Sequence, residues 1–577
     1  MDALLPGKLA YVFYVSVVDA AILSVIVLLW FRHSVRALMR SASAPASLAD
    51  VTGAIAPPAA AAAQTSLSSP AALSFALFES APSAPDVRLD TASEGPLRRR
   101  LTIAYALGAV AYSLVMTAFQ LVGEDPALPF VAWLARVWVN AWPLLPSLVA
   151  LLVADRRSTL RLALLYLLIG VTAEFVTTLA GQLSRGTLNA APITNLYWMV
   201  ASLVLTIYAP LVLIVISGWR RIRSVMPIAL AGVIVFGFAL LAFGSAMISM
   251  LDRESVRSSI VAASTLTSVR VVYYGLFLIA SLPVGWLAWR LLRWIANGFE
   301  RKRFSDVQLI VDCWWMIVAA EQASLLSTTR GYIGVVAGLA AFAAYRVVVA
   351  VMLRHAPGDR SPRRLLLLRV FGYQQRTEKL FDRVAQAWRF EGPVQLIAGV
   401  DLASRTATPG AILRLLSGSL RQQYIANAAD IQARIAQLDG VPDRDGRFRI
   451  NNVYCHDDTW RGALTALLEA SDCVLMDLRG FSARNQGCVF ELEQLLLRVP
   501  LASVVLVVDD GTDLRLLGQT LTQSWTRAFG SVAGTLSLVF IQARAANHLA
   551  SLMSRLKGLG TPDRIVAGDA LALARTM

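Results

Sequence analysis

Long apolar runs dominate the first 350 residues of the chain. A helix needs about 20 mostly apolar residues to cross a bilayer, and about nine runs reach this length. They lie at about 10-31, 101-122, 132-153, 159-182, 193-217, 226-250, 270-292, 306-327 and 331-353. The first run is about 22 residues long, which exceeds the 7 to 15 of a signal-peptide core. The pattern therefore predicts an α-helical polytopic membrane bundle whose first span is an uncleaved anchor.

A different pattern begins at Pro362, where short apolar runs alternate with amphipathic segments. Strands are expected at 365-371, 394-400, 449-455, 473-478, 503-508 and 536-542. Helices are expected at 377-388, 410-438, 459-470, 487-499 and 513-528. Regular alternation of strand and helix predicts parallel βαβ units, and strands that are apolar on both sides indicate a sheet covered on both faces. The expected fold is a doubly wound, flavodoxin-like α/β domain.

These patterns divide the chain into four parts. Residues 1-40 form the first anchor, 101-355 the rest of the bundle with about eight spans, and 362-577 the α/β domain. Residues 41-100 are rich in Ala, Pro and Ser and show no helical periodicity. Such a composition buries little apolar surface, so we expect a disordered linker on the cytoplasmic side.

Composition supports the membrane assignment. Of the 577 residues 56% are hydrophobic and 16% are charged, whereas soluble domains contain about 25% charged residues. The net charge of +15 does not indicate a nucleic-acid partner, because many arginines flank the apolar runs, where they set topology. The lipid bilayer is the expected partner.

The positive-inside rule predicts the orientation of the chain. If all nine runs cross, the arginine-rich segments fall on one side, with the N-terminus outside and the residues after 354 in the cytoplasm. Abundant Arg and Ala with few Lys suggest a bacterial source, and hence an inner-membrane location. Charged residues within the runs either mark an ion path or pair inside the bundle, and we favour pairing; they are Asp19, Arg136, Glu174, Asp312, Glu321 and Arg346.

Ligands of doubly wound sheets bind at the carboxyl ends of the strands. The segment DLRGFSARNQGCVFELEQLL, residues 477 to 496, crosses this edge. Its loop supplies Asp477, Arg479 and Asn485 as candidate substrate-binding residues, and Glu491 is expected in the first turn of the next helix. On a helical wheel Glu491 and Glu493 lie at the two margins of the buried stripe, so geometry alone does not choose between them.

Two more candidates follow the first strand of this domain. Gly372 and Arg376 are expected on the same edge, and an arginine beside a helix N-terminus is a candidate phosphate ligand. The chain has no G-x-G-x-x-G after this strand and no G-x-x-x-x-G-K-[ST], so neither a dinucleotide fingerprint nor an ATPase loop is supported. Four cysteines without C-x-x-C spacing and four histidines indicate no metal site.

An apolar strand, a polar loop and then CVFELEQL resemble a region of Toll/interleukin-1 receptor (TIR) domains. Cys488 matches the family's cysteine, and Glu491 and Leu492 match its Glu-Leu pair. In enzymatic members this Glu cleaves the nicotinamide-ribose bond of NAD, so the resemblance implies that Glu491 is catalytic and that NAD is a substrate rather than a cofactor. The stretch is also similar to nucleoside 2-deoxyribosyltransferases, in which a Glu attacks the deoxyribosyl carbon; Asn485, Gly487 and Glu491 are the matching positions.

The chain departs from the TIR pattern where Gly487 replaces the usual Trp and where an extra segment lies between 401 and 458. Besides a transporter formed by the membrane half and regulated by the α/β domain, two functions stay open. The first is a membrane-anchored enzyme that cleaves an N-glycosidic bond of NAD or a nucleoside. The second is a non-catalytic module that senses a nucleotide or self-associates as a homo-oligomer while the bundle signals. In the second case Glu491 complements a helix dipole, which contributes about 0.3–1 kcal/mol.

Overall fold

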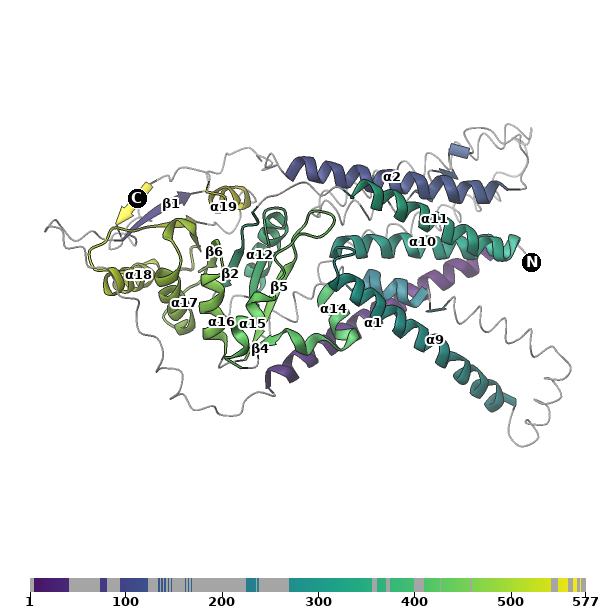
Figure 1. Ribbon diagram of the computed structural model, residues 1–577, viewed down its shortest axis with the longest axis horizontal. Coiled ribbons are helices and arrows are strands. Elements are labelled where there is room, and N and C mark those ends of the chain that lie inside the picture. The colour runs from purple at the N-terminus through teal and green to yellow at the C-terminus, as the bar shows by residue number, and fades with distance from the viewer. Residues whose placement is uncertain are drawn as a thin grey trace. The chain divides into compact units, whose positions relative to one another are not determined.

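The computed structural model divides the chain into two compact units, each described here by itself (Figure 1). The structure describes residues 5–40, 73–79, 94–122, 225–234, 269–354, 361–369, 374–398, 409–425, 427–456, 459–540, 548–558 and 564–567, with isolated positions elsewhere. The helical unit comprises Met1–Arg32, Gly95–Pro357 and Ser404–Leu420. The α/β unit comprises His33–Glu94, Gly358–Ala403 and Arg421–Met577.

Long helices make up the described part of the helical unit. They are α1 (Leu5–Arg40), α2 (Glu94–Leu121), α9 (Val269–Glu300), α10 (Asp306–Arg330), α11 (Tyr332–Met352) and the shorter α14 (Pro409–Ser417). Local chemistry fixes the ends of α10. The Ser305 hydroxyl accepts a hydrogen bond from the Gln308 N–H at 3.1 Å, and Gly331, with φ of 60°, ends the helix, which is the conformation that glycine adopts most easily.

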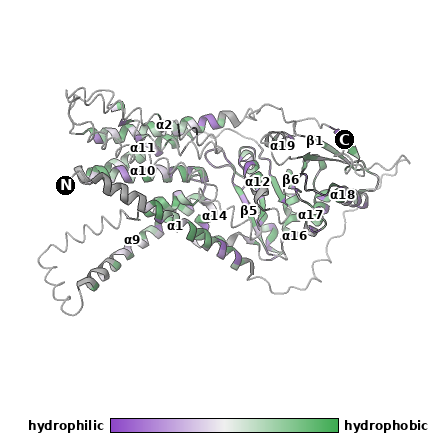
Figure 2. Ribbon diagram, turned by 180° about the vertical axis from the view of Figure 1, so that it is seen from behind, coloured by the Kyte–Doolittle hydropathy of each residue, from purple (hydrophilic) through white to green (hydrophobic). Residues whose placement is uncertain are grey.

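Four of these helices are long and apolar enough to cross a membrane (Figure 2). The candidate spans are Ser16–Leu38, Leu97–Leu121, Asp306–Ser327 and Tyr332–Met352. The expectation of nine spans is thus met in part. The runs at 132-153, 159-182, 193-217 and 226-250 lie wholly or partly outside the described residues, and the run at 270-292 lies in α9, which is not among the four.

Small residues and paired charges join α10 to α11. A Cβ on Gly338 would lie 2.7 Å from the Cβ of Ala323, so the two helices approach as closely as glycine allows. Asp312 on α10 forms an ion pair with Arg346 on α11, and the Tyr345 hydroxyl donates to Asp312 at 3.0 Å. These two in-span charges pair inside the unit, as we expected, because an isolated charge in hydrocarbon is costly.

In the part of the chain that the structure describes, the α/β unit is built on one nine-stranded sheet. Its strands are β1 (Ser74–Glu79), β2 (Leu365–Arg369), β3 (Val394–Ala398), β4 (Tyr424–Ile425), β5 (Ile450–Cys455), β6 (Cys473–Asp477), β7 (Val504–Val508), β8 (Thr535–Phe540) and β9 (Arg564–Ala567). Their order is β4-β5-β3-β2-β6-β7-β8-β1-β9, and every pairing is parallel except that of β1 with β9. The expected parallel sheet is confirmed, with one antiparallel edge strand. The central order β3-β2-β6-β7-β8 matches the 2-1-3-4-5 order of flavodoxin-type sheets.

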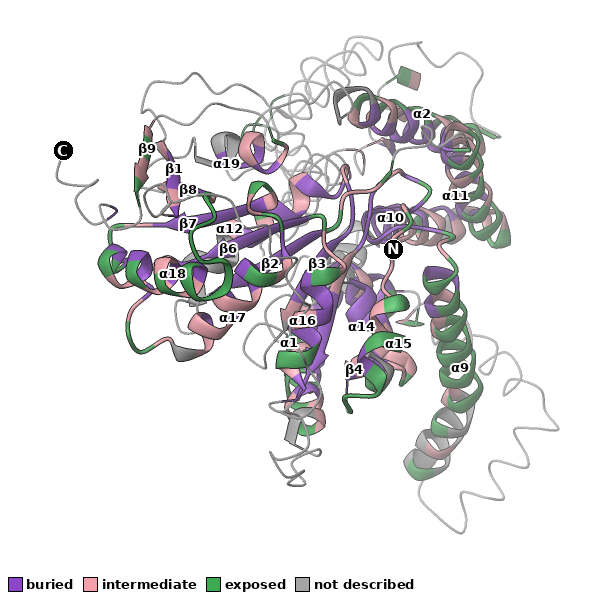
Figure 3. Cartoon of the chain, turned by 60° about the vertical axis from the view of Figure 1, so that its left-hand side comes forward, coloured by how far each residue is buried: buried purple, intermediate pink, exposed green. Residues whose placement is uncertain are grey.

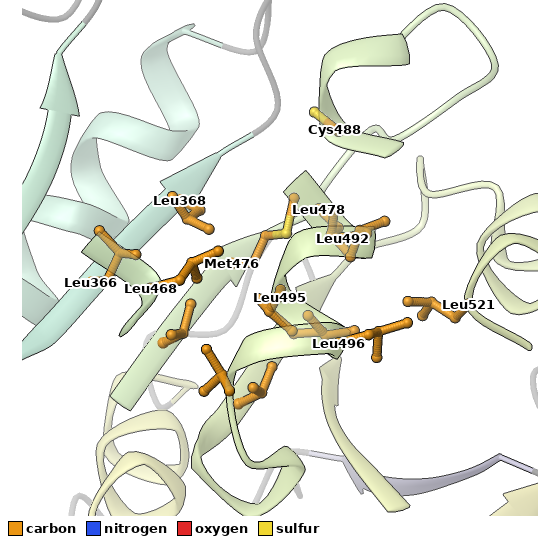
Figure 4. Packing of buried hydrophobic residues seen from close by; sticks show 14 of the residues in the cluster. Leu366, Leu368, Leu468, Met476, Leu478, Cys488, Leu492, Leu495, Leu496 and Leu521 are labelled. Carbon is orange, nitrogen blue, oxygen red and sulfur yellow. The ribbon is translucent and has the colours of Figure 1, made fainter. Parts of the chain in front are cut away.

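Helices cover both faces of this sheet. They are α12 (Gln374–Trp388), α15 (Asp430–Ala436), α16 (Trp460–Glu469), α17 (Gln486–Arg498), α18 (Leu514–Phe529) and α19 (His548–Leu556), with 3₁₀ turns at Leu420–Gln423 and Leu501–Ser503. Alternate residues of each strand serve opposite faces. Leu366 and Leu368 pack with α16, α17 and α18, whereas Leu365 and Leu367 pack with α12 and α19. Figure 3 shows the resulting buried strands, and Figure 4 shows the cluster beneath α17.

Two segments differ from the sequence-based expectations. Within the expected linker 41-100, the run SFALFE forms β1 between β8 and β9. Phe75 and Leu77 of this strand are buried, as is Leu73 just before it. The Ala/Pro/Ser-rich composition of the surrounding residues predicts disorder, and it masks the signal of this short apolar strand. The expected long helix at 410-438 is instead α14, a 3₁₀ turn, β4 and α15, because the chain turns at Gly418, whose φ is 79°.

Candidate functional site at the carboxyl edge of the sheet

The carboxyl ends of β2 and β6 form the point at which the winding of the sheet reverses. The chain continues from β2 to β3 on one side, and β6 lies on the other side of β2 and leads to β7. Such a switch point is where doubly wound sheets bind ligands. The last pair in register between the two strands is Arg369 with Asp477, and both side chains are buried.

Asp477 holds the loop that follows β6. Arg479 donates from Nε to Oδ1 at 2.8 Å and from a terminal nitrogen to Oδ2 at 2.7 Å, and its backbone N–H adds a bond of 3.2 Å. This two-pronged pair is nearly shielded from water, with Asp477 only 1% exposed. Removal of one partner from a buried pair leaves an uncompensated charge, so Asp477 and Arg479 act as one unit.

Asp509, directly after β7, ties the neighbouring loop to the same edge. Its Oδ1 accepts from the backbone N–H of Gly480 at 3.1 Å and of Gly511 at 3.0 Å. The Thr512 hydroxyl donates to the Leu478 carbonyl at 3.0 Å. Gly480 has a φ of 71°, a conformation that glycine permits without strain. The carboxylates of Asp477 and Asp509 are therefore engaged in shaping loops.

The loop closes on α17 through Asn485. The side-chain oxygen of Asn485 accepts from the N–H and the hydroxyl of Ser482, at 3.0 and 3.1 Å. The buried Cys488 then follows in the first turn of α17, with its Sγ 4.0 Å from the carbonyl oxygen of Arg369. This contact fixes the start of α17 against the end of β2.

Glu491 lies one helical turn after Cys488 and so faces the same way, because residues three apart share a helix face. Its side chain is 4% exposed, and its Oε2 has no hydrogen-bond partner among the residues that the structure describes. Burial raises the pKa of Glu491 to about 8, and the positive charge of Arg369 partly opposes this rise. An unpartnered buried carboxyl oxygen costs about 1–3 kcal/mol, a cost that suits a group held ready for a ligand.

The structure distinguishes the two acids that the sequence left equivalent. Glu493 is 36% exposed and lies 3.9 Å from Arg527 on α18, so it is a surface residue. We had expected Glu491 in the first turn of its helix. Instead α17 begins at Gln486, which places Glu491 in the second turn. Its position beyond the first turn also argues against the helix-dipole interpretation, since the dipole effect falls off within that turn.

An aromatic pair borders the same edge. Trp460 begins α16 and Phe490 directly precedes Glu491, and their rings meet edge to face with centroids 5.6 Å apart. The Arg461 guanidinium lies over both rings, at 5.6 and 5.2 Å. Aromatic faces with a nearby cation offer a surface on which a heterocyclic base can stack.

The other two sequence candidates are not placed by the structure. Gly372 lies outside the described residues, and Arg376 lies in α12 without a described side chain. The four cysteines are free and buried. Among the described residues no group of three or more His, Cys, Asp and Glu is arranged to hold a metal ion.

Sequence reasoning missed Arg369 and Asp509. Arg369 follows four leucines and reads as part of an apolar strand, yet a charged residue at the last position of a parallel strand was the available signal. Asp509 had the same signal, since it follows the run VVLVV. Comparison with protein-family models, curated proteins and solved structures finds no match to this chain.

Proposed function

We propose that the α/β unit binds a nucleotide or nucleoside at the carboxyl edge of its sheet and cleaves an N-glycosidic bond with Glu491. The observation that carries this proposal is the buried carboxyl of Glu491, whose Oε2 has no partner among the described residues. It lies where α17 meets the β2/β6 switch point, the place at which such sheets take their ligands. The resemblance of this stretch to TIR domains and deoxyribosyltransferases points to the same residue.

The chemistry requires one negative charge beside the anomeric carbon. Cleavage passes through an oxocarbenium-like transition state, which a carboxylate stabilises. With NAD, the C1′–N bond breaks, nicotinamide leaves with the electron pair, and water adds to C1′ and releases a proton. The cationic nicotinamide ring would favour the ionised form of Glu491 as it binds. Trp460 and Phe490 offer the rings against which the base stacks.

The test uses the full chain, because a fragment that starts near Ser361 lacks β1, which lies between β8 and β9. Release of nicotinamide from NAD, and of free bases from nucleosides, is followed by chromatography. Glu491→Gln is expected to lower turnover by at least about 100-fold, within the range for a positioned catalytic group. The matched control Glu493→Gln keeps wild-type turnover. Equal losses in both variants, or none in either, would contradict the proposal.

One observation favours a second function, a nucleotide-sensing module. Glu491 is only 4% exposed, so a ligand reaches it only if the edge opens on binding. An edge that opens without chemistry would work as a sensor coupled to the membrane helices or to a second copy of the chain. Saturable binding of NAD by a protein that releases no product, together with ligand-dependent oligomerisation, would support this second function over the first.

For the membrane half we propose nine spans in a bacterial inner membrane, with the N-terminus outside and the α/β unit in the cytoplasm. Four candidate spans and the arginine-rich segments beside the apolar runs support this topology. Single cysteines placed at Ser43 and Thr187 test it. A membrane-impermeant thiol reagent applied to intact cells should label the second site and not the first, and the reverse pattern would overturn the orientation.

A further inference from the structure

The second half of α9 carries large apolar side chains that the protein leaves uncovered. From Leu282 to Trp294 the side chains are exposed or half-buried, and Figure 3 shows α9 in the exposed colour along most of its described length. Trp286, Trp289 and Trp294 are 56%, 49% and 61% exposed. Tryptophan is enriched at the boundary between hydrocarbon and water, because its ring is apolar and its N–H is polar. These rings therefore indicate contact with a membrane surface.

Two arginines share one face of α9 with two of these rings. Residues spaced by three and four positions follow a single helix face, and this Trp–Arg face consists of Leu282, Trp286, Trp289, Arg290 and Arg293. The Arg290 guanidinium lies 5.2 Å from the centroid of the Trp286 ring, and the Arg293 guanidinium lies 4.2 Å from that of Trp289. A guanidinium over a ring keeps its in-plane N–H donors for another ligand.

The positive charge of this face is not balanced within the described part of the protein. Among the described residues neither Arg290 nor Arg293 forms an ion pair. The acid of α9, Glu300, lies 3.8 Å from Arg414 on α14. The sequence RKR at 301–303 adds further positive charge beyond the end of the helix. The Trp–Arg face thus presents arginine donors to an acceptor outside the chain.

Charge and polarity together decide which occupant fits this face. A second copy of the chain would bring arginines of like charge together, which is unfavourable. A phospholipid matches both features, because its phosphate accepts paired N–H donors from arginine and its apolar part surrounds the tryptophan rings. The proposed topology places this end of α9 at the cytoplasmic leaflet, whose surface is negatively charged.

We propose that the Trp–Arg face of α9 binds the phosphate of an anionic phospholipid, with Arg290 and Arg293 as its ligands. The rings of Trp286 and Trp289 hold the two guanidinium groups and contact the apolar part of the same lipid. This site goes beyond the proposed function and does not depend on the chemistry at Glu491.

The test measures lipid binding to the full chain in detergent by native mass spectrometry, which gives the number of bound lipids and the oligomeric state together. Phosphatidylglycerol is titrated against zwitterionic phosphatidylcholine. Wild type is compared with the double variants Arg290→Gln/Arg293→Gln and Arg290→Lys/Arg293→Lys. The matched control Arg515→Gln/Arg527→Gln removes the same charge from two exposed arginines of α18. The exposure of all four positions makes loss of folding an unexpected outcome, and thermal unfolding checks it.

Wild type and the α18 control should bind phosphatidylglycerol at least about 10-fold more tightly than phosphatidylcholine, and Arg290→Gln/Arg293→Gln should lose this preference. The double lysine variant should lose most of it, because an ammonium group neither stacks on a ring nor donates paired hydrogen bonds in one plane. A glutamine variant within about 2-fold of wild type would overturn the inference. So would a lysine variant that binds as wild type does, since surface charge alone would then explain the affinity.

Three further results separate a lipid from other occupants. Excess inorganic phosphate should not displace phosphatidylglycerol, and displacement would show a site for a free anion instead. The glutamine variant should keep the oligomeric state of wild type; a dimer that dissociates in this variant would assign the face to a second copy. Trp286→Leu/Trp289→Leu should weaken binding of phosphatidylglycerol by about 3-fold or more, because the guanidinium groups lose their rings, and unchanged affinity would contradict the role of the rings.

Discussion

Glu491→Gln should change the pH dependence of stability in a direction that the structure fixes. The folded-state pKa of Glu491, about 8, lies above its ordinary value of 4.5 because the side chain is buried. The folded protein therefore holds the proton more tightly than the unfolded chain does. The contribution of Glu491 to the free energy of unfolding is fully present below pH 4.5 and is lost as the pH rises through 8.

The magnitude follows from the difference between the two pKa values, which at about 1.36 kcal/mol per pH unit amounts to about 5 kcal/mol over the whole range. Between pH 6 and pH 8 the wild-type protein should lose about 2 kcal/mol from this group, whereas Glu491→Gln should lose none of it. At about 2–4 °C per kcal/mol for a domain of this size class, the loss corresponds to roughly 4–8 °C in Tm.

Calorimetry of the full chain in detergent at constant salt measures both proteins at pH 6, 7 and 8. The Tm difference between the two proteins at a single pH is not informative, because burying the Gln amide has a free-energy cost of its own. The expected result is a Tm of wild type that falls relative to Glu491→Gln as the pH rises. A Tm difference that stays constant across this range would refute the assignment of Glu491 as a buried, protonated carboxyl.

Substitutions at three places in the molecule test the packing. Asp312→Asn and Arg346→Met should each destabilise the helical unit in detergent by about 1–3 kcal/mol, and the double variant by less than their sum, because each single change leaves one half-buried charge without its partner; additive losses would contradict the pairing. Asp513→Ala should lower the thermal stability of the α/β unit by about 1 kcal/mol, since the Asp513 side chain caps α18, and an unchanged Tm would count against that cap. Gly410→Val should destabilise the helical unit, measured by thermal aggregation, because a Cβ there would lie 2.6 Å from the Phe299 ring, whereas Gly410→Ala should cost less; equal stability of all three proteins would refute this close approach.

The α/β fold was predictable because each of its central strands has a clear local signal in the sequence. Apolar runs such as CVLMDL and SVVLVV alternate with amphipathic helices, and this alternation permits few topologies. The strand β1 was not predicted because its pairing with β8 joins residues about 460 positions apart. Nothing in SFALFE itself reveals such a distant partner, and the surrounding Ala, Pro and Ser indicate disorder.

Part of the candidate site was also predictable. The loop after β6 contains Asp477, Arg479 and Asn485, and the switch-point rule locates their edge without coordinates. What the sequence could not supply was the environment of each group. Whether an acid on α17 is buried or exposed depends on how the helix is rotated against the sheet, although the helix starts within one residue of the predicted position. Only the burial of Glu491 and the exposure of Glu493 in the folded protein separate these two acids.

The most direct test of a ligand site at this edge is equilibrium binding of NAD to the full chain, because both the enzyme and the sensor require it. Dissociation constants are measured by calorimetric titration for wild type, Glu491→Gln, Glu493→Gln and Asp477→Asn. We predict binding by the first three and a loss of at least about 10-fold in Asp477→Asn, since its loop loses a buried ion pair. Wild-type affinity in a folded Asp477→Asn protein, or no binding of NAD or nucleosides by any of the four, would contradict the assignment of this edge as a nucleotide site.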